Sequence, residues 1–162
     1  MPTRGFCAML ALLFMACLSP RAGAAADVSL PEVRGWECGE PRVISFDSVS
    51  GSQGFWWERD YRTPEGTRFK ATLMGGKGPK YYNQPAHGIE SDDGPFGSGG
   101  TYETIMVGGY RAVLETHPIL GVSLAVNASD AGCVLTLEAG NWTPPGEIIG
   151  AAEILLPIAV KK

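Results

Sequence analysis

Two adjacent glycines, Gly108 and Gly109, constrain the fold of this chain more than any other feature of its sequence. They lie between two runs of strand-forming residues, Tyr102 to Val107 and Tyr110 to Glu115. Because glycine adopts positive φ without strain, a Gly-Gly pair favours the two-residue turn that joins antiparallel strands. The sequence therefore predicts a hairpin in which the residues that flank the two glycines lie opposite each other.

A second hairpin is predicted between Phe55 to Arg62 and Thr67 to Met74. Pro64 suits the first corner of the connecting turn, and Gly66 suits a position with positive φ. The register that follows places Phe55, Trp57 and Tyr61 on one face with Phe69, Ala71 and Leu73, and it sets Asp60 opposite Lys70 on the other face. Apolar and charged side chains then separate, as in a sheet with one buried face.

The other strand-like runs are Arg42 to Ser48, Gly121 to Asn127 and Cys133 to Glu138. After Gly140 the apolar residues recur at helical spacing instead. Thr143 is the expected N-cap, Pro144 the expected first helical residue, and Pro157 the expected end of the helix. We predict an α+β fold, with an antiparallel β-meander of about six strands and a C-terminal α-helix packed on one face.

The first 26 residues have the pattern of an export signal. Arg4 precedes an apolar run from Phe6 to Leu18, and an alanine-rich stretch follows. The apolar run is too short to span a bilayer as a helix. We expect residues 1–26 to be removed, which leaves residues 27–162 as a single exported domain, either periplasmic or secreted.

The cysteines divide between these two parts. Cys7 and Cys17 lie in the signal, where Phe14 to Cys17 loosely resembles a lipobox, so a lipid anchor on Cys17 is the minor alternative. The two remaining cysteines enter an oxidising compartment, and neither belongs to a Cys-x-x-Cys motif. We therefore expect a disulfide between Cys38 and Cys133.

Net charge restricts the partners of the exported domain. Residues 1–26 contain two arginines and no carboxylate, so their removal changes the formal charge from −4 to −6. Nucleic-acid binding requires clustered Lys and Arg, and attachment to anionic lipid requires a polybasic segment. We expect no nucleic-acid partner and no transmembrane segment in the mature chain. The partner is instead an unknown protein or small molecule of the cell envelope.

Residues 76–100 form the least regular part of the sequence. They contain seven glycines and three prolines and show no periodicity. Long loops in compact domains are commonly functional or disordered. We predict a long Gly-rich loop here, either a mobile surface loop or a binding loop that offers Tyr81, Tyr82 and Phe96 to a partner.

Residue patterns for metal or cofactor binding are weak. His87, Glu90, Asp92 and Asp93 cluster within the loop, but their spacing does not match an EF-hand. The sequence also lacks a Gly-x-Ser-x-Gly motif, a phosphate-binding loop, a His-Glu-x-x-His motif and a dinucleotide fingerprint. We predict neither a metal nor a cofactor.

Catalytic carboxylates are the remaining route to an enzyme. Glu58 and Asp60 alternate along one predicted strand and resemble the carboxylate pair of a glycosidase. Arg68 and Lys70 on the neighbouring strand favour cross-strand ion pairs instead. We therefore predict no catalytic residues.

Arg59 is predicted among aromatic residues on the apolar face of its strand, where an unpartnered charge is costly. One interpretation packs its stem on aromatics while its head reaches water or a carboxylate. The other makes it the anion-binding group of a pocket that the 76–100 loop closes. Trp56, three residues earlier, belongs to the aromatic strand that we expect to contact a partner.

These observations predict a small exported protein that binds a partner without catalysis, or that associates with the envelope. Contacts would come from the strand around Trp56 and from the long loop. Two alternatives stay open: a small extracytoplasmic hydrolase that uses loop carboxylates, and an inhibitor of a secreted enzyme. Sequons at Asn127 and Asn141 matter only in a host that glycosylates.

Overall fold

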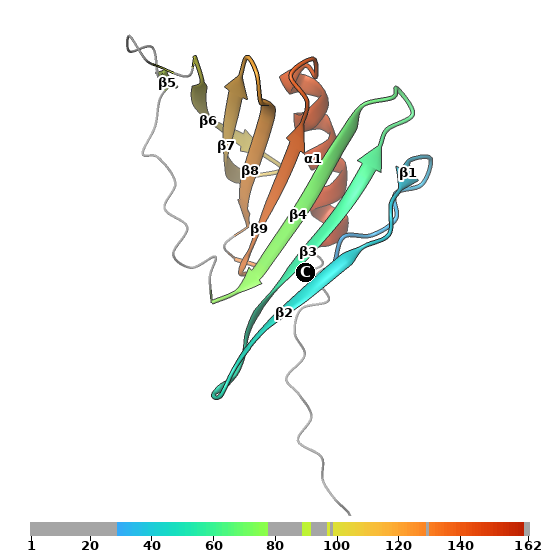
Figure 1. The fold of residues 1–162 in the computed structure, drawn as a ribbon, viewed down its shortest axis with the longest axis vertical. Helices are drawn as coiled ribbons and strands as arrows, with labels where there is room; N and C mark the ends of the chain where they lie inside the picture. The colour runs from blue at the N-terminus through green and yellow to red at the C-terminus, as the bar shows by residue number, and fades with distance from the viewer. Residues whose placement is uncertain (1–28, 78–88, 92–96, 98, 129, 161–162) are drawn as a thin grey trace, which may run out of the picture.

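Apolar residues that alternate between glycine-rich turns give this chain an antiparallel sheet, and one helix covers part of one face (Figure 1). The structure is a computed structural model that describes residues 29–77, 89–91, 97, 99–128 and 130–160. The expected signal at residues 1–26 lies outside the described residues, as do Tyr81, Tyr82 and Phe96 of the expected binding loop.

The strands are β1 (Glu37–Cys38), β2 (Arg42–Ser48), β3 (Gly51–Arg62), β4 (Arg68–Gly76), β5 (Ile89–Ser91), β6 (Thr101–Val107), β7 (Tyr110–His117), β8 (Gly121–Ala128) and β9 (Cys133–Ala139). The helix is α1 (Pro145–Ala159). The described part of the sheet thus has nine strands rather than about six. The prediction missed β1 and β5, which have two and three residues and are too short to show alternation.

Strand order is β1-β3-β4-β9-β8-β7-β6-β5, and β2 pairs with β3. Two meanders, β2-β3-β4 and β6-β7-β8-β9, therefore meet where β4 pairs with β9. Strand β4 lies inside this order, whereas β5, the next described strand in the chain, lies at its far end. All strand pairs are antiparallel, as expected.

Both predicted hairpins are confirmed. The amide of Thr63 donates to the carbonyl oxygen of Thr67 over 2.9 Å, which closes the turn between β3 and β4. Between β6 and β7, Gly108 and Gly109 have φ of 55° and 86°, which only glycine adopts readily. Turn chemistry in the sequence was sufficient to set both registers.

Helix α1 packs on β6, β8 and β9, and its buried residues are Ile148, Ala151, Ala152, Leu155, Leu156 and Ala159. Its ends differ from the prediction. The N-cap is Pro144 rather than Thr143, and no side chain caps the helix. Pro157 lies inside the last turn instead of ending the helix, and the amide of Val160 still donates to the carbonyl oxygen of Leu156 over 2.9 Å. A proline so near the end removes only one hydrogen bond, which the packing of the apolar face offsets.

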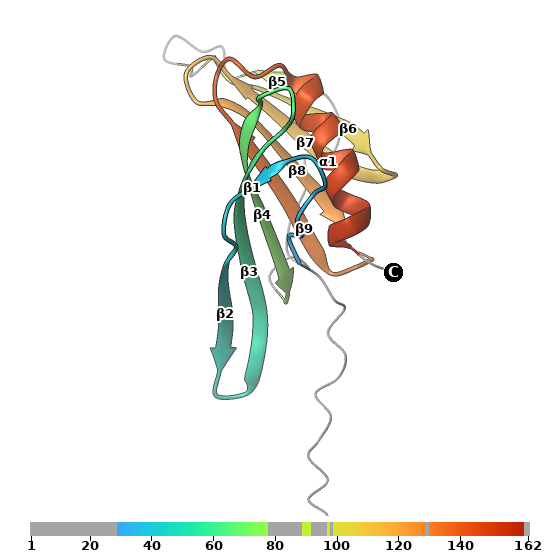
Figure 2. The ribbon, with the colours of Figure 1, turned by 90° about the vertical axis from the view of Figure 1, so that its right-hand side faces the viewer.

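An N-terminal segment covers the part of this face that lies over β3. Leu30 and Val33 are buried there, and Trp36 contacts both Tyr61 and Phe69 edge to face, with ring centroids 5.8 and 5.6 Å apart. Helix and segment therefore share one face of the sheet, which we call the helix face (Figure 2). The opposite face, called the open face, carries no helix in the described part of the chain.

The expected disulfide between Cys38 and Cys133 is wrong: both cysteines are free. Cys38 pairs with Tyr61, which lies opposite Phe69, whereas Cys133 pairs with Gly75. Six residues of β4 separate these two levels, or about 20 Å of strand at ~3.3 Å per residue. A disulfide requires Cα atoms within about 7 Å.

The described residues contain no helix with the length and apolarity needed to cross a bilayer. Helix α1 has 15 residues.

Candidate functional site

The most prominent surface of the described structure is a hairpin at the β2 edge of the sheet. It consists of β2 and the first part of β3, residues 42–58, and we call it the arm. Residues 54–58 pair with β4, and the tip of the arm beyond them projects past the ends of β4, β9 and α1 (Figure 2). All seven residues of β2 are exposed, although its sequence, Arg-Val-Ile-Ser-Phe-Asp-Ser, is largely apolar in the middle.

Two rows of facing apolar side chains cross the sheet and reach β2, the outer strand of the arm. On the open face, Ile44 lies opposite Trp56, Trp56 opposite Met74, and Met74 opposite Val134. On the helix face, Val43 lies opposite Trp57, which continues into the core through Leu73. Both rows end at β2, so the apolar part of the sheet is not closed at this edge.

The exposed fractions of these end residues are large for side chains of their type. Val43, Ile44 and Phe46 are 48%, 38% and 43% exposed, and Val49 at the apex is fully exposed. Single exposed apolar residues are common on proteins, but a contiguous group marks an interaction surface. Here Ile44 and Phe46 are neighbours on the open face of β2, Val43 lies on its helix face, and Val49 follows the strand at the apex.

Glycine contacts mark the point where the arm extends past β4. Gly54 lies opposite Gly76, and a side chain at either position would collide with the facing backbone. The ring of Phe55 occupies the space above Gly75. The close approach of β3 and β4 at this point therefore requires glycine at these positions.

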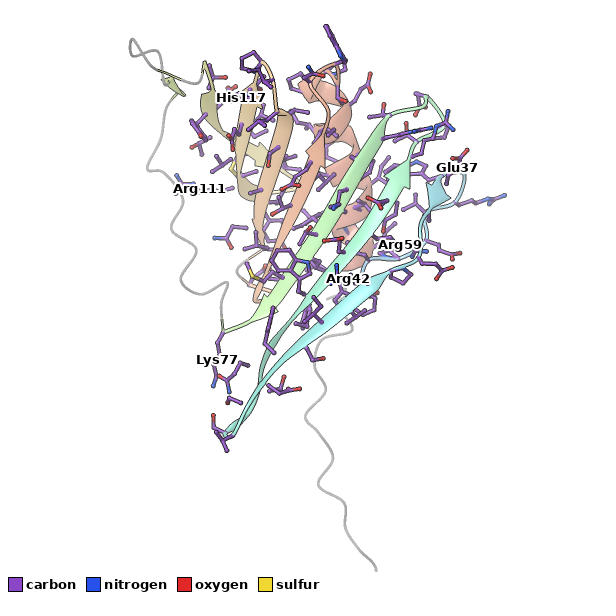
Figure 3. All side chains as sticks on the ribbon, viewed as in Figure 1. Glu37, Arg42, Arg59, Lys77, Arg111 and His117 are labelled. Carbon is purple, nitrogen blue, oxygen red and sulfur yellow. The ribbon has the colours of Figure 1, made fainter. Side chains whose placement is uncertain are left out.

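Hydrogen bonds hold the apex of the arm. The side-chain amide of Gln53 donates to Ser48 Oγ over 2.8 Å and to the carbonyl oxygen of Gly51 over 2.9 Å. Lys77, which follows β4, donates from Nζ to Gln53 Oε1 over 2.7 Å (Figure 3). These contacts tie the apex to the sheet, so the arm presents a defined strand rather than a loose loop.

Trp56 and Arg59, both predicted as binding residues, lie on opposite faces of β3. Trp56 is half-buried on the open face of the arm, whereas Arg59 is only 7% exposed on the helix face. The alternation of side chains along a strand separates them. They do not form one site.

Internal partners surround the guanidinium of Arg59. Nε donates to the carbonyl oxygen of Gly39 over 2.7 Å, and Nη1 donates to that of Leu30 over 3.0 Å. Nη2 pairs with the exposed carboxylate of Glu32 at 3.3 Å, and the group lies 5.9 Å from the ring centre of Tyr61. This geometry matches an arginine that packs on an aromatic and reaches a carboxylate, and an anion bound here would have to displace those contacts.

A second candidate is a shallow hollow of about 680 Å³ at the opposite end of the open face. Its charged lining residues are Glu37, Asp60, Glu138, Arg62, Arg68 and Lys70. Because it has as many acidic as basic lining residues, the hollow carries no net charge. Arg62 pairs with Glu37 at 3.4 Å, and ligand pockets are usually more apolar than this.

The carboxylates considered for catalysis are engaged in sheet pairs. Glu58 accepts an ion pair from Lys70 at 3.6 Å, and Asp60 lies opposite Lys70 in the register. Among the described residues, no three His, Cys, Asp or Glu side chains gather closely enough to hold a metal ion. The loop carboxylates of the hydrolase alternative, Asp92 and Asp93, lie outside the described residues.

The imidazole of His117 and the thiol of Cys133 are reactive groups in principle, but the fold uses the first in a turn and buries the second. His117 Nδ1 accepts hydrogen bonds from the amides of Ile119 and Leu120 over 3.1 and 3.0 Å, and so orders the turn between β7 and β8, at the end of the sheet away from the arm (Figure 3). Burial, and to a smaller extent Asp130, raises the pKa of the Cys133 thiol to about 11. A thiol with so high a pKa is a poor nucleophile at neutral pH.

Comparison of the chain with protein-family models, curated proteins and solved structures finds no match. The candidate site therefore rests on its own geometry.

Sequence reasoning recognised Arg42 to Ser48 as a strand but not as a surface. The signal was present in Val43 and Ile44, two consecutive apolar residues that must point to opposite faces of the sheet. A strand that is apolar on both faces is normally interior. Only the position of β2 at the edge turns this pattern into an exposed surface.

Proposed function

We propose that this protein is an exported, non-catalytic binding module, and that the arm is its contact surface. The observation that supports the proposal is that both rows of facing apolar side chains end at β2, where no described strand continues them. A strand of a partner added there would cover Val43, Ile44 and Phe46 and would use the backbone groups of the β2 edge that no described strand pairs with. This mode is β-strand addition, in which main-chain hydrogen bonds give affinity and side chains give specificity.

The most direct test replaces apolar side chains of the arm with charge. The double variant Ile44→Lys/Phe46→Lys should keep its fold, because both side chains are exposed, and should lose its partners in capture from envelope extract. The matched control is Ile119→Lys/Leu120→Lys, whose side chains are 76% and 75% exposed in the turn between β7 and β8. Equal capture by the two variants would contradict the assignment of the arm.

Amide hydrogen exchange gives an independent measure. Outward-facing amides of β2 should exchange quickly in the free protein and slowly in the captured complex, because a paired edge is protected. Amides of β8, which is paired on both sides, should change little. Protection confined to other elements would place the contact surface elsewhere.

Export is part of the same proposal. The intact mass of protein recovered outside the cytoplasm should correspond to a chain that begins near residue 27. A hydrolytic activity of the purified protein that is lost in Asp92→Ala/Asp93→Ala and kept in the arm variant would favour the hydrolase alternative.

A further inference from the structure

The free edge of β2 has properties that restrict what can pair with it. Within the described residues, β2 pairs with β3 alone. Proteins usually protect such edges with Lys, Pro or inward-pointing charges. The seven residues of β2 include neither Lys nor Pro, and their charges, Arg42 and Asp47, lie near the two ends.

The added strand must be apolar on the open face, where it meets Ile44 and Phe46. On the helix face it meets Val43 together with the polar residues Ser45 and Asp47, so polar groups are tolerated there. Among the described strands, β2 itself combines this alternation with an unpaired edge.

We propose that the arm pairs with the arm of a second copy, β2 against β2, to form a symmetric dimer with a continuous sheet. This inference rests on the proposed function of the arm and names its partner. Such pairing is antiparallel about a twofold axis perpendicular to the sheet, so the same patch serves both copies. Each open face continues into the open face of the other copy.

The side chains select one register for this pairing. Facing residues must lie on the same face of the sheet, so one residue of β2 must face its own copy across the twofold axis. We name each register by that residue. An axis at Ser45 places Ile44 opposite Phe46 of the second copy, and this contact occurs twice. An axis at Ile44 would set Phe46 against Arg42, and an axis at Phe46 would set Ile44 against Ser48.

The register at Ser45 also suits the neighbours of these residues. In the structure Phe46 lies opposite Gly54, which has no side chain, while Ile44 lies opposite Trp56. Pairing would therefore extend the open-face row from Trp56 through Ile44 to Phe46 of the second copy. Arg42 would face the hydroxyl of Ser48, and Asp47 would face Val43 on the helix face, so no like charges oppose each other.

Cysteine cross-linking tests the register directly. Facing residues of an antiparallel pair have Cα atoms about 4.5–5.5 Å apart, which suits a disulfide. In a background whose native cysteines are replaced by alanine, Ser45→Cys should form a disulfide-linked dimer under mild oxidation. Ser48→Cys is the matched control, because its two copies would lie about 20 Å apart at ~3.3 Å per residue.

Substitutions that introduce opposite charges test the contact between Ile44 and Phe46. In sedimentation equilibrium the wild-type protein should associate to a dimer, and Ile44→Lys should weaken the association at least about tenfold, since it sets two lysines against apolar rings. Adding Phe46→Glu to the same chain should restore part of the affinity, because each introduced lysine would face an introduced glutamate. The control Ile119→Lys should leave the association unchanged.

Three outcomes would overturn self-pairing: a wild-type protein that stays monomeric at high concentration, cross-linking of Ser48→Cys in preference to Ser45→Cys, or open-ended polymers. Polymers would indicate pairing of β2 with the edge of β6, beyond the residues that β5 covers. A monomeric protein whose arm variant still loses capture of another protein would contradict the dimer alone. If the arm variant changes neither dimerisation nor capture, the proposed function fails as well.

Discussion

Arg59 donates a hydrogen bond from Nε to the carbonyl oxygen of Gly39 over 2.7 Å, across the bend that separates β1 from β2. Both short strands pair with the same side of β3, and Gly39 lies between them. The amide of Gly39 in turn donates to the carbonyl oxygen of Asp60 over 2.8 Å. This contact fixes the point at which the arm begins.

Replacing Arg59 should therefore cost stability. Arg59→Met keeps an apolar stem but leaves the carbonyl oxygens of Gly39 and Leu30 without their donor, and hydrogen bonds from charged donors contribute about 1.5–3 kcal/mol each. We expect urea denaturation to show a loss of at least about 2 kcal/mol in the free energy of unfolding. Arg62→Met is the control, because the exposed pair of Arg62 with Glu37 is worth ~0–1 kcal/mol. Similar losses for the two variants would show that Arg59 does not anchor the N-terminal segment.

The thiol of Cys133 should make stability depend on pH in the alkaline range. Burial raises its pKa to about 11 in the folded protein, above the ordinary value of about 9 for a thiol. Between these values the unfolded chain loses a proton that the folded chain keeps, so the free energy of unfolding should fall as pH rises from 9 towards 11. Cys133→Ala should flatten that fall, as measured by denaturant titration at each pH.

The two thiols should also differ in accessibility. Cys38 is partly exposed, and Cys133 is buried. Mass spectrometry after alkylation of the native protein should find Cys38 modified first and Cys133 modified only in denaturant. A linked Cys38 to Cys133 peptide in protein from an oxidising compartment would contradict the arrangement of β1 and β9.

A glycine in the helix gives a prediction of the opposite sign. A methyl group at Gly150 would meet nothing within 4 Å, and alanine stabilises a helix interior by about 0.5–1 kcal/mol relative to glycine. We expect Gly150→Ala to raise the melting temperature. Gly121→Ala should lower it, because Gly121 has φ of 105° and a side chain there would collide with the backbone at Ala139 and Gly140. Destabilisation by Gly150→Ala would mean that the helix lies closer to its neighbours than the structure indicates.

Local chemistry in the sequence was sufficient for much of the sheet. The turns at Pro64 to Gly66 and at Gly108-Gly109 fixed their registers, because positive φ and a two- or three-residue loop leave little freedom. Alternation then assigned Phe69 and Leu73 to the buried face. The apolar side of the C-terminal helix followed from its 3.6-residue period, although its ends did not.

Contacts between distant segments were not available to this reasoning. The pairing of β4 with β9 joins two meanders that are far apart in sequence, and it places Cys38 and Cys133 about six residues apart along the strands. An even number of cysteines suggested a disulfide, but only the sheet order determines the distance between them. The partners of Arg59 likewise come from a segment about twenty to thirty residues earlier.

The sequence by itself determined the strands, the tight turns and the apolar face of the helix, because each depends on neighbouring residues and on the period of a regular element. Tertiary structure alone decided that β2 lies at an edge of the described sheet and leads to a tip that projects beyond β4. The same residues, Val43 and Ile44, would be core in an interior strand and are surface here, since exposure depends on which strand lies beside them. The candidate site is therefore a property of sheet order rather than of any motif.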